Sequence, residues 1–275
     1  MIARLNWLDG DSGDDDDDDR HRCGPAGSPA LKLLAIDSAT ERLALAAIET
    51  APSPDIVAAD LDGGATASRV ALPSLLALVA SRGWRLQDVG AVAYGQGPGG
   101  FTGLRTACAV AQGLAFGLGI PVLAVDSLCL VAQAARAGRP DAFAPGGVVW
   151  VAMDARMDEI YAACYVPRAD GGWDTRVAPR LVEPGALLAA WQAAPPDVVA
   201  DSAPAAFGAR LPTGPAVVLA GDTGRAHALG QLAARAWSAG ARRPADQALP
   251  LYLRDKVALT TVEREALRAA RGPAP

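Results

Sequence analysis

Two carboxylates occupy matching places in the chain. Asp37 ends one apolar run and Asp154 ends another, and a polar break and a second apolar run follow each of them. A carboxylate at such a turn can hold Mg²⁺ while the backbone N–H groups of the turn bind phosphate oxygens. Turns of that kind normally contain a glycine, and neither 37–40 nor 154–157 has one. Asp37, Thr40 and Asp154 are therefore weak candidates for a nucleotide site, and carboxylates that hydrogen-bond their own turns are the favoured interpretation.

A glycine-rich stretch covers residues 95–103, with the sequence Gly-Gln-Gly-Pro-Gly-Gly-Phe-Thr-Gly. Such a loop before a helix can cradle an anion, with Gly97 and Gly99 as candidate contacts and Arg105 in the first helical turn. It lacks both the Gly-Lys-Ser/Thr ending of a Walker A loop and the GxGxxG spacing of dinucleotide sites. Glycines that let a turn pack closely beneath a helix explain the stretch equally well, so both interpretations stay open.

Metal and nucleophile chemistry find little support. The histidines and cysteines are scattered, without a CxxC pair or the spacing of zinc ligands, at His21, His227, Cys23, Cys108, Cys129 and Cys164. The GxSxG motif of a serine nucleophile is also missing. We predict no catalytic residue and no metal ligand, with the thiols reduced and used as small apolar side chains.

Apolar patterning becomes regular at Leu31 and occurs twice. In the first copy it predicts a β-hairpin, a third strand, and then helices alternating with strands. The predicted helices of this copy cover 68–81, 102–117 and 128–137, with Thr102 and Ser127 as N-caps. A second copy starts near Val148, and an offset of 117 residues places Asp154 on Asp37. The matching acids favour a duplication over two unrelated halves that share a hairpin.

Two lobes that each open on a hairpin with an acid at its turn describe the architecture of actin, Hsp70 and sugar kinases. The predicted fold class is therefore α/β, a duplicated RNase H-like fold of this two-lobed (ASKHA) type. We place the N-terminal lobe at 31–140 and the C-terminal lobe at 148–260.

Residues 1–30 form an acidic segment ahead of the predicted lobes. They include six consecutive aspartates at 14–19 and carry the whole formal net charge of −5, so the rest of the chain is balanced. This composition predicts a disordered extension. A protein that binds nucleic acid by itself usually has a basic excess, and none is found here.

No secretory signal pattern is present at the N-terminus. The uncharged stretch 106–125 reaches the length of a membrane span, but its glycines and proline predict a buried helix, a turn and a strand. We therefore expect a soluble, cytoplasmic protein that does not contact a membrane.

The first two helices carry more apolar residues than one buried face requires. In the second helix one stripe holds Leu104, Cys108, Ala111 and Ala115, and another holds Ala107, Val110, Leu114 and Leu118. Either the helix is sandwiched inside its own lobe, or one face packs on the sheet and the other on a partner protein. The spacing alone does not choose between these alternatives.

At this point the residues resemble a known family, TsaB (also called YeaZ), over about 31–259. The segments that carry the resemblance are 33–38, 68–73, 97–105, 125–128, 154–157 and 250–254. Among them Gly-Pro-Gly-Gly-Phe-Thr-Gly-Leu-Arg at 97–105 is highly specific. Two positions depart from the family pattern, because Ala67 replaces a common histidine and Gly100 a common serine; both could tune the interface.

The resemblance implies a non-catalytic subunit of the bacterial complex that makes N6-threonylcarbamoyladenosine in tRNAs reading codons that begin with A. It implies a heterodimer with the catalytic paralogue TsaD, a ternary complex with the ATPase TsaE, and a homodimer when TsaD is absent. ATP and metal then belong to the partner subunits, and tRNA is bound only through the complex. Pairing is expected on the first-lobe helices, at Ser68, Arg69, Leu72, Leu75, Leu76, Leu104, Arg105, Ala107, Cys108 and Ala111.

Two other functions compete with this one. A catalytic TsaD-like threonylcarbamoyltransferase would need a helical HxxxH pair, and a small-molecule kinase would need glycine-bearing phosphate turns; the sequence has neither. The isolated protein is therefore expected neither to modify tRNA nor to hydrolyse ATP. If the striped helices pair with TsaD, Leu75→Asp or Leu104→Asp should weaken pairing and leave the fold intact.

Overall fold

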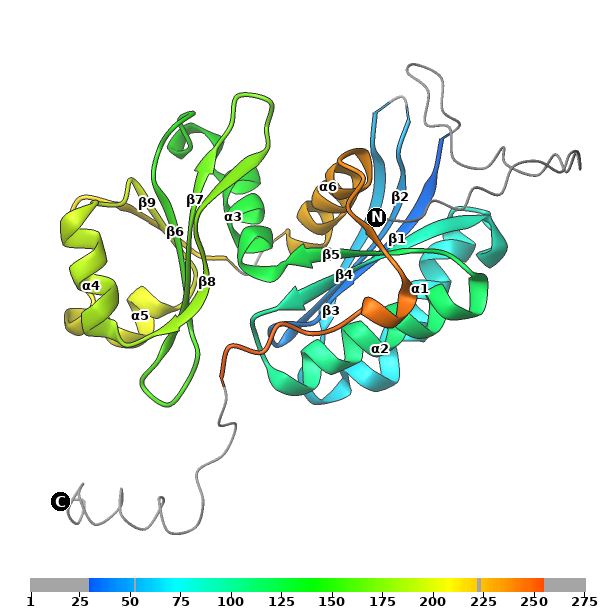
Figure 1. Ribbon diagram of the computed structural model, residues 1–275, viewed down its shortest axis with the longest axis horizontal. Helices are drawn as coiled ribbons and strands as arrows, with labels where there is room; N and C mark the ends of the chain where they lie inside the picture. The colour runs from blue at the N-terminus through cyan, green and yellow to red at the C-terminus, as the bar shows by residue number, and fades with distance from the viewer. Residues whose placement is uncertain (1–29, 52, 222–223, 255–275) are drawn as a thin grey trace, which may run out of the picture.

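The computed structural model describes residues 30–51, 53–221 and 224–254, which form two lobes, each built on one β-sheet (Figure 1). The predicted acidic extension, except its last residue, and the predicted end of the second lobe lie outside these ranges. The first sheet consists of β1 (Lys32–Asp37), β2 (Arg42–Glu49), β3 (Asp55–Asp62), β4 (Val89–Gly97), β5 (Val122–Asp126) and β11 (Arg242–Arg243). The second consists of β6 (Val149–Asp154), β7 (Ile160–Pro167), β8 (Trp173–Val182), β9 (Val198–Ala200) and β10 (Val217–Leu219).

The two sheets repeat one topology. The order β3-β2-β1-β4-β5 in the first corresponds to β8-β7-β6-β9-β10 in the second. In each sheet the first two strands are an antiparallel hairpin, while the first strand runs parallel to the strand on its other side. The predicted duplication is confirmed, and the fold is a duplicated RNase H-like α/β fold.

Helices cover both faces of the first sheet. On one face lie α1 (Ala67–Ser81) and α2 (Phe101–Leu118), with a core that includes Leu34, Ile36, Leu75 and Ala107. On the other face lies α6 (Arg225–Ser238), and α3 (Ser127–Gly138) packs beside it, between the two sheets (Figure 1). The second lobe also holds α4 (Pro184–Ala193) and the short α5 (Ala203–Phe207).

The predicted lobe boundary is wrong at the C-terminal side. Helix α6 follows the second sheet in the chain, but its Ala226, Leu229 and Ala233 pack against the first sheet. The chain then adds β11 to the edge of that sheet, and the N–H of Leu251 donates to the carbonyl of Gln96 at 2.6 Å. Apolar burial accounts for the difference, because α6 covers the face of the first sheet that α1 and α2 leave open.

Two helix starts also differ from the prediction. Helix α2 begins after Gly100 and not after Thr102. Helix α3 is capped by Asp126, whose carboxylate accepts hydrogen bonds from the N–H groups of Leu128 and Cys129. A capping carboxylate satisfies two free N–H groups at a helix start, and this leaves Ser127 available for other contacts.

The stretch 106–125 forms most of α2, a turn at the left-handed Gly119, and all but the last residue of β5, as predicted. A different segment of the described chain, Gly64–Ser81, is long and apolar enough to cross a membrane by length and composition alone. It contains α1, and Ala71, Leu75 and Val79 of that helix are in the core of the first lobe.

Burial changes the acidity of two of the thiols. It raises the pKa of Cys108 from 9.0 to about 12 and that of Cys164 to about 11. We expect neither thiol to react with an alkylating reagent at pH 8.5 in the native protein, and both to react in denaturant; peptide mapping by mass spectrometry measures this. Because the unfolded thiols ionise first, these groups should also lower stability as the pH rises above 9. Rapid native labelling of either would contradict the packing.

Candidate functional site: a filled turn and an exposed helical face

Asp37, the first candidate magnesium ligand, is fully buried and already has partners. One carboxylate oxygen accepts a hydrogen bond from Nη2 of Arg225 at 2.9 Å, and the other accepts from the hydroxyl of Ser127 at 2.6 Å. The Ser127 oxygen in turn accepts from the N–H of Gly97 at 3.1 Å. The guanidinium of Arg225 therefore compensates the charge of Asp37, the carboxylate that was a candidate Mg²⁺ ligand in the sequence.

Arg225 is a residue of this buried cluster that the sequence did not indicate. It is the first residue of α6, 188 positions from Asp37, and only 1% of its side chain is exposed. No pattern in the sequence joins two residues so far apart. The signal becomes visible only once α6 is known to pack on the first sheet.

The glycine-rich loop packs directly on the turn between β1 and β2. The hydroxyl of Ser38 donates to the carbonyl of Gly103 at 2.7 Å, and the N–H of Gly100 donates to the carbonyl of Ala39 at 2.7 Å. A Cβ at Gly99 would overlap the Ala39 carbonyl, and one at Gly103 would overlap the Ser38 carbonyl. Close packing therefore accounts for these glycines, which is the second of the two interpretations left open above.

Glycine is required at positions 95 and 97 for two other reasons. A Cβ at Gly95 would overlap the carboxylate of Asp37. Gly97 has a φ of +104°, a conformation that side chains other than glycine rarely adopt. Both requirements come from the protein's own packing.

Substitution of Gly103 by alanine tests this packing. The added methyl group would collide with backbone, which cannot move aside as a flexible side chain can. We expect Gly103→Ala to lower the free energy of unfolding by about 3 kcal/mol, measured by chemical denaturation. Gly113→Ala in the same helix is the matched control, since nothing lies within 4 Å of its added Cβ; it should stabilise α2 by about 0.5 kcal/mol. Equal stabilities of the two variants would contradict the packing.

Asp154 and Thr40 bind their own turns. The carboxylate of Asp154 accepts from the N–H of Arg156 at 2.8 Å, and the hydroxyl of Thr40 accepts from the N–H of Arg42 at 3.2 Å. Asp154 is at the same place in its lobe as Asp37, but its carboxylate contacts Arg156, two residues further along the chain. In the part of the chain that the structure describes, no group of three or more His, Cys, Asp or Glu residues could hold a metal ion.

The turn after Asp154 has an unusual backbone. Arg156, Met157 and Asp158 have φ values of +63°, +56° and +64°, a left-handed conformation that is unfavourable for residues other than glycine. Arg254 stabilises this turn: its guanidinium donates to the carbonyls of Ala155 and Arg156 and forms an ion pair with Glu159 at 2.7 Å.

A second surface lies on the outer side of α1 and α2, which we call the α1–α2 face. It exposes large apolar side chains: 40% of Leu72, 39% of Leu76, 42% of Phe101 and 80% of Phe116 are accessible. We define the face by Ser68, Arg69, Leu72 and Leu76 of α1 and by Phe101, Arg105, Ala109 and Phe116 of α2, all of which are exposed.

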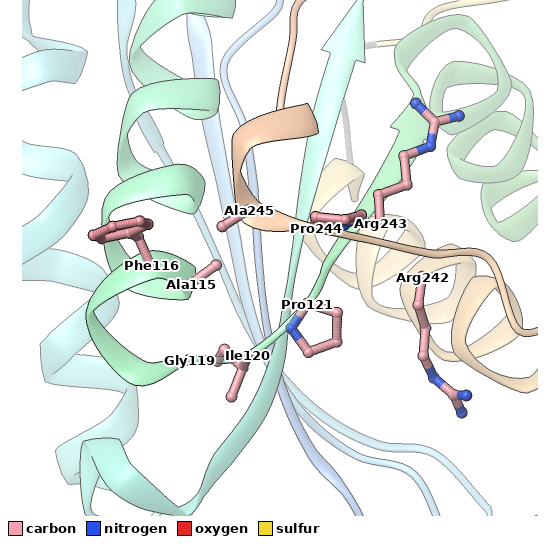
Figure 2. Close-up of a pocket in the computed structure, with 9 residues that line it drawn as sticks. All are labelled: Ala115, Phe116, Gly119, Ile120, Pro121, Arg242, Arg243, Pro244 and Ala245. Atoms are coloured by element: carbon pink, nitrogen blue, oxygen red, sulfur yellow. The ribbon is translucent and has the colours of Figure 1, made fainter. Parts of the chain in front are cut away.

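The ring of Phe101 connects this face to the C-terminal segment. It stacks on the ring of Tyr252, with the centroids 5.3 Å apart, and the guanidinium of Arg105 lies 5.2 Å from its centroid. At the other end of the face, Phe116 borders a hollow of about 520 Å³ between the end of α2 and β11 (Figure 2). In Figure 2 the side chains of Arg242 and Arg243 point away from each other at the rim of the hollow.

Comparison with known proteins identifies the family to which this chain belongs. A model of the family described as "TsaD: tRNA N6-adenosine threonylcarbamoyltransferase" matches residues 65–258. The structure of YeaZ from Pseudomonas aeruginosa superimposes with a TM-score of 0.68 and 34% identity, covering 81% of this chain and all of the other. The chain belongs to the TsaB/YeaZ family.

Two curated relatives carry the TsaB name, "tRNA threonylcarbamoyladenosine biosynthesis protein TsaB". The Haemophilus influenzae protein is 38% identical over 131 residues, which are 48% of this chain and 52% of that protein. The Escherichia coli protein is 32% identical over 165 residues, which are 56% of this chain and 63% of that protein. The matched segments thus span about half to two thirds of the length of these TsaB proteins.

The structure divides the contact residues predicted for this TsaB/YeaZ chain into two sets. Exposed on the α1–α2 face are Ser68, Arg69, Leu72, Leu76 and Arg105. Buried in the core of the lobe are Leu75, Leu104, Ala107, Cys108 and Ala111. The buried set cannot meet a partner on this surface, because those side chains pack against the sheet and against each other.

The prediction that Leu75→Asp or Leu104→Asp weakens pairing and leaves the fold intact is wrong, because both side chains belong to this buried set. Both side chains are at most 1% exposed, so a carboxylate at either position would unfold the lobe. Of the two departures from the TsaB/YeaZ pattern, Ala67 is also buried and lies off the face, while Gly100 is exposed at the start of α2.

Proposed function

We propose that this chain is a non-catalytic partner subunit of the complex that forms N6-threonylcarbamoyladenosine in tRNAs reading codons that begin with A. In this role it pairs with the catalytic subunit TsaD, and TsaE joins the pair. The chain alone forms a homodimer, tRNA binds only to the complex, and the complex acts in the cytoplasm. Membership of the TsaB/YeaZ family supports this assignment, since the relatives named above are tRNA threonylcarbamoyladenosine biosynthesis proteins.

The observation that carries the proposal is the exposed apolar surface of the α1–α2 face. Large apolar side chains at Leu72, Leu76, Phe101 and Phe116 lie on two adjacent helices of one lobe. Large apolar side chains exposed on neighbouring helices are typical of a protein–protein interface, and two adjacent helices offer ridges and grooves for a partner's helices.

The turn after β1 supports a role without nucleotide chemistry, because the carboxylate of Asp37 is already bonded to Arg225 and Ser127. A Mg²⁺-nucleotide at Asp37 would have to displace the guanidinium of Arg225 and the hydroxyl of Ser127 from a fully buried carboxylate. It would also have to separate the glycine-rich loop from the turn on which it packs. We therefore propose that ATP and metal are bound by the partner subunits and that this chain binds neither tightly.

Reconstitution from purified proteins tests the proposal. Unmodified tRNA is incubated with ATP, threonine, bicarbonate, the enzyme that makes the threonylcarbamoyl adenylate, TsaD and TsaE, with and without this chain. We expect threonylcarbamoyladenosine, detected by nucleoside mass spectrometry, only when both this chain and TsaD are present. Modification by this chain without TsaD would favour a catalytic role, and ATP hydrolysis by the chain alone would favour a kinase-like role.

A further inference from the structure

The α1–α2 face carries positive charge without a compensating carboxylate. Arg69 and Arg105 are both exposed, and neither α1 nor α2 contains an aspartate or a glutamate. Within the described residues no ion pair joins either arginine to an acid. Arginine and carboxylate side chains do pair elsewhere on the surface, for example Arg210 with Asp158 at 2.7 Å.

Both arginines lie among the apolar side chains of the face. Arg69 is three residues before Leu72 and seven before Leu76, which places the three on one side of α1. The guanidinium of Arg105 lies 5.2 Å from the centroid of Phe101, and this contact limits its freedom. A partner that covers the apolar side chains would therefore also cover the two guanidinium groups and remove water from them.

A second copy of the chain is a poor electrostatic match for this face. In a two-fold symmetric dimer the same surface patch meets itself. Such a pairing through the α1–α2 face would bring four guanidinium groups together, with no carboxylate from α1 or α2 of either copy. Like charges at an interface oppose association, whereas carboxylates opposite the arginines would favour it.

Resting on the proposed function, we infer that the α1–α2 face selects a partner whose helical surface carries aspartate or glutamate side chains opposite Arg69 and Arg105. The apolar residues supply contact area for either partner. The two arginines make the acidic partner preferred over self-association, so the heterodimer with TsaD forms at the expense of the homodimer.

The dependence of both associations on salt tests this inference, because the two should respond in opposite directions. The full-length chain is titrated with TsaD at 50 and 500 mM NaCl, and its self-association is measured by analytical ultracentrifugation in the same buffers. We expect salt to weaken the heterodimer by about tenfold, since attraction is screened, and to strengthen the homodimer by about threefold, since repulsion is screened.

Charge removal provides the matched variants. Arg69→Gln with Arg105→Gln should weaken the heterodimer about tenfold at low salt, flatten its salt dependence and strengthen self-association. Arg176→Gln is the control: it removes an exposed charge from β8 of the other lobe and should change neither association. If neither salt nor the double substitution changes the affinity for TsaD, the inference is overturned while the proposed function stands. Failure of the wild-type chain to bind TsaD at all would overturn both.

The acidic run 14–19 of this same chain is a second source of carboxylates, which the test must distinguish from the partner. Replacement of all six aspartates by asparagine in the full-length chain separates the two. If the partner supplies the carboxylates, the affinity for TsaD stays within twofold of the wild type. An increase of fivefold or more would show that the chain's own segment covers the face, and would overturn the inference.

Discussion

Replacement of Leu72 and Leu76 together by aspartate should abolish pairing with TsaD and leave the lobe folded. Both side chains are about 40% exposed on α1, so two carboxylates there remain solvated in the free protein. In a complex they would be buried without partners in the middle of an apolar contact. We expect the dissociation constant to rise at least about 100-fold, because apolar residues at the centre of an interface contribute most of its binding energy. Isothermal titration calorimetry measures this.

The neighbouring Leu75 provides the control for this experiment. Leu75 directly precedes Leu76 on the same helix, but its side chain is fully buried in the core of the lobe. Leu75→Asp therefore places a carboxylate in that core. We expect this variant to lose its native circular dichroism, while the Leu72→Asp/Leu76→Asp variant keeps it. Unchanged binding of TsaD by a folded Leu72→Asp/Leu76→Asp variant would show that the α1–α2 face is not the contact surface.

Loss of the ion pair between Arg225 and Asp37 should strongly lower the stability of the fold. Arg225→Met keeps most of the apolar length of the side chain and removes the charge that compensates Asp37. The remaining carboxylate is fully buried, and among the described residues its other partners are the hydroxyl of Ser127 and the N–H of Ala39. We expect the free energy of unfolding to fall by about 3 to 5 kcal/mol, the usual cost of breaking a buried pair.

A double-mutant cycle isolates this interaction from the packing of the side chain. Asp37→Asn combined with Arg225→Met removes both charges, so it should be more stable than the sum of the two single changes predicts, by about 2 kcal/mol. Denaturant titration of the four proteins gives the coupling energy. Additive effects would indicate that Arg225 and Asp37 do not compensate each other in solution.

The local elements were predictable because apolar spacing and turn residues encode them. The two hairpins, the offset of 117 residues between Asp37 and Asp154, and the helix, turn and strand at 106–125 were all confirmed. Each depends on residues that are close in the chain or on a pattern that repeats. Helix starts were less certain, because Gly100 and Asp126 compete with Thr102 and Ser127 within two positions of each other.

The candidate site could be predicted only in part. Spacing identified two apolar stripes on α2, but it could not show which side chains the sheet and α1 cover and which stay exposed. In the structure most of both stripes is covered, and the large apolar residues that α2 exposes are Phe101 and Phe116 at its ends. The pair of Asp37 and Arg225 was beyond prediction, because it depends on α6 crossing to the first sheet.

The mass of the complex in solution tests the central claim most directly. The full-length chain, TsaD and an equimolar mixture are passed separately over a sizing column with multi-angle light scattering. The account predicts that the equimolar mixture elutes as one species with the mass of one copy of each protein. Two species with the masses of the separate proteins, at concentrations well above micromolar, would contradict it.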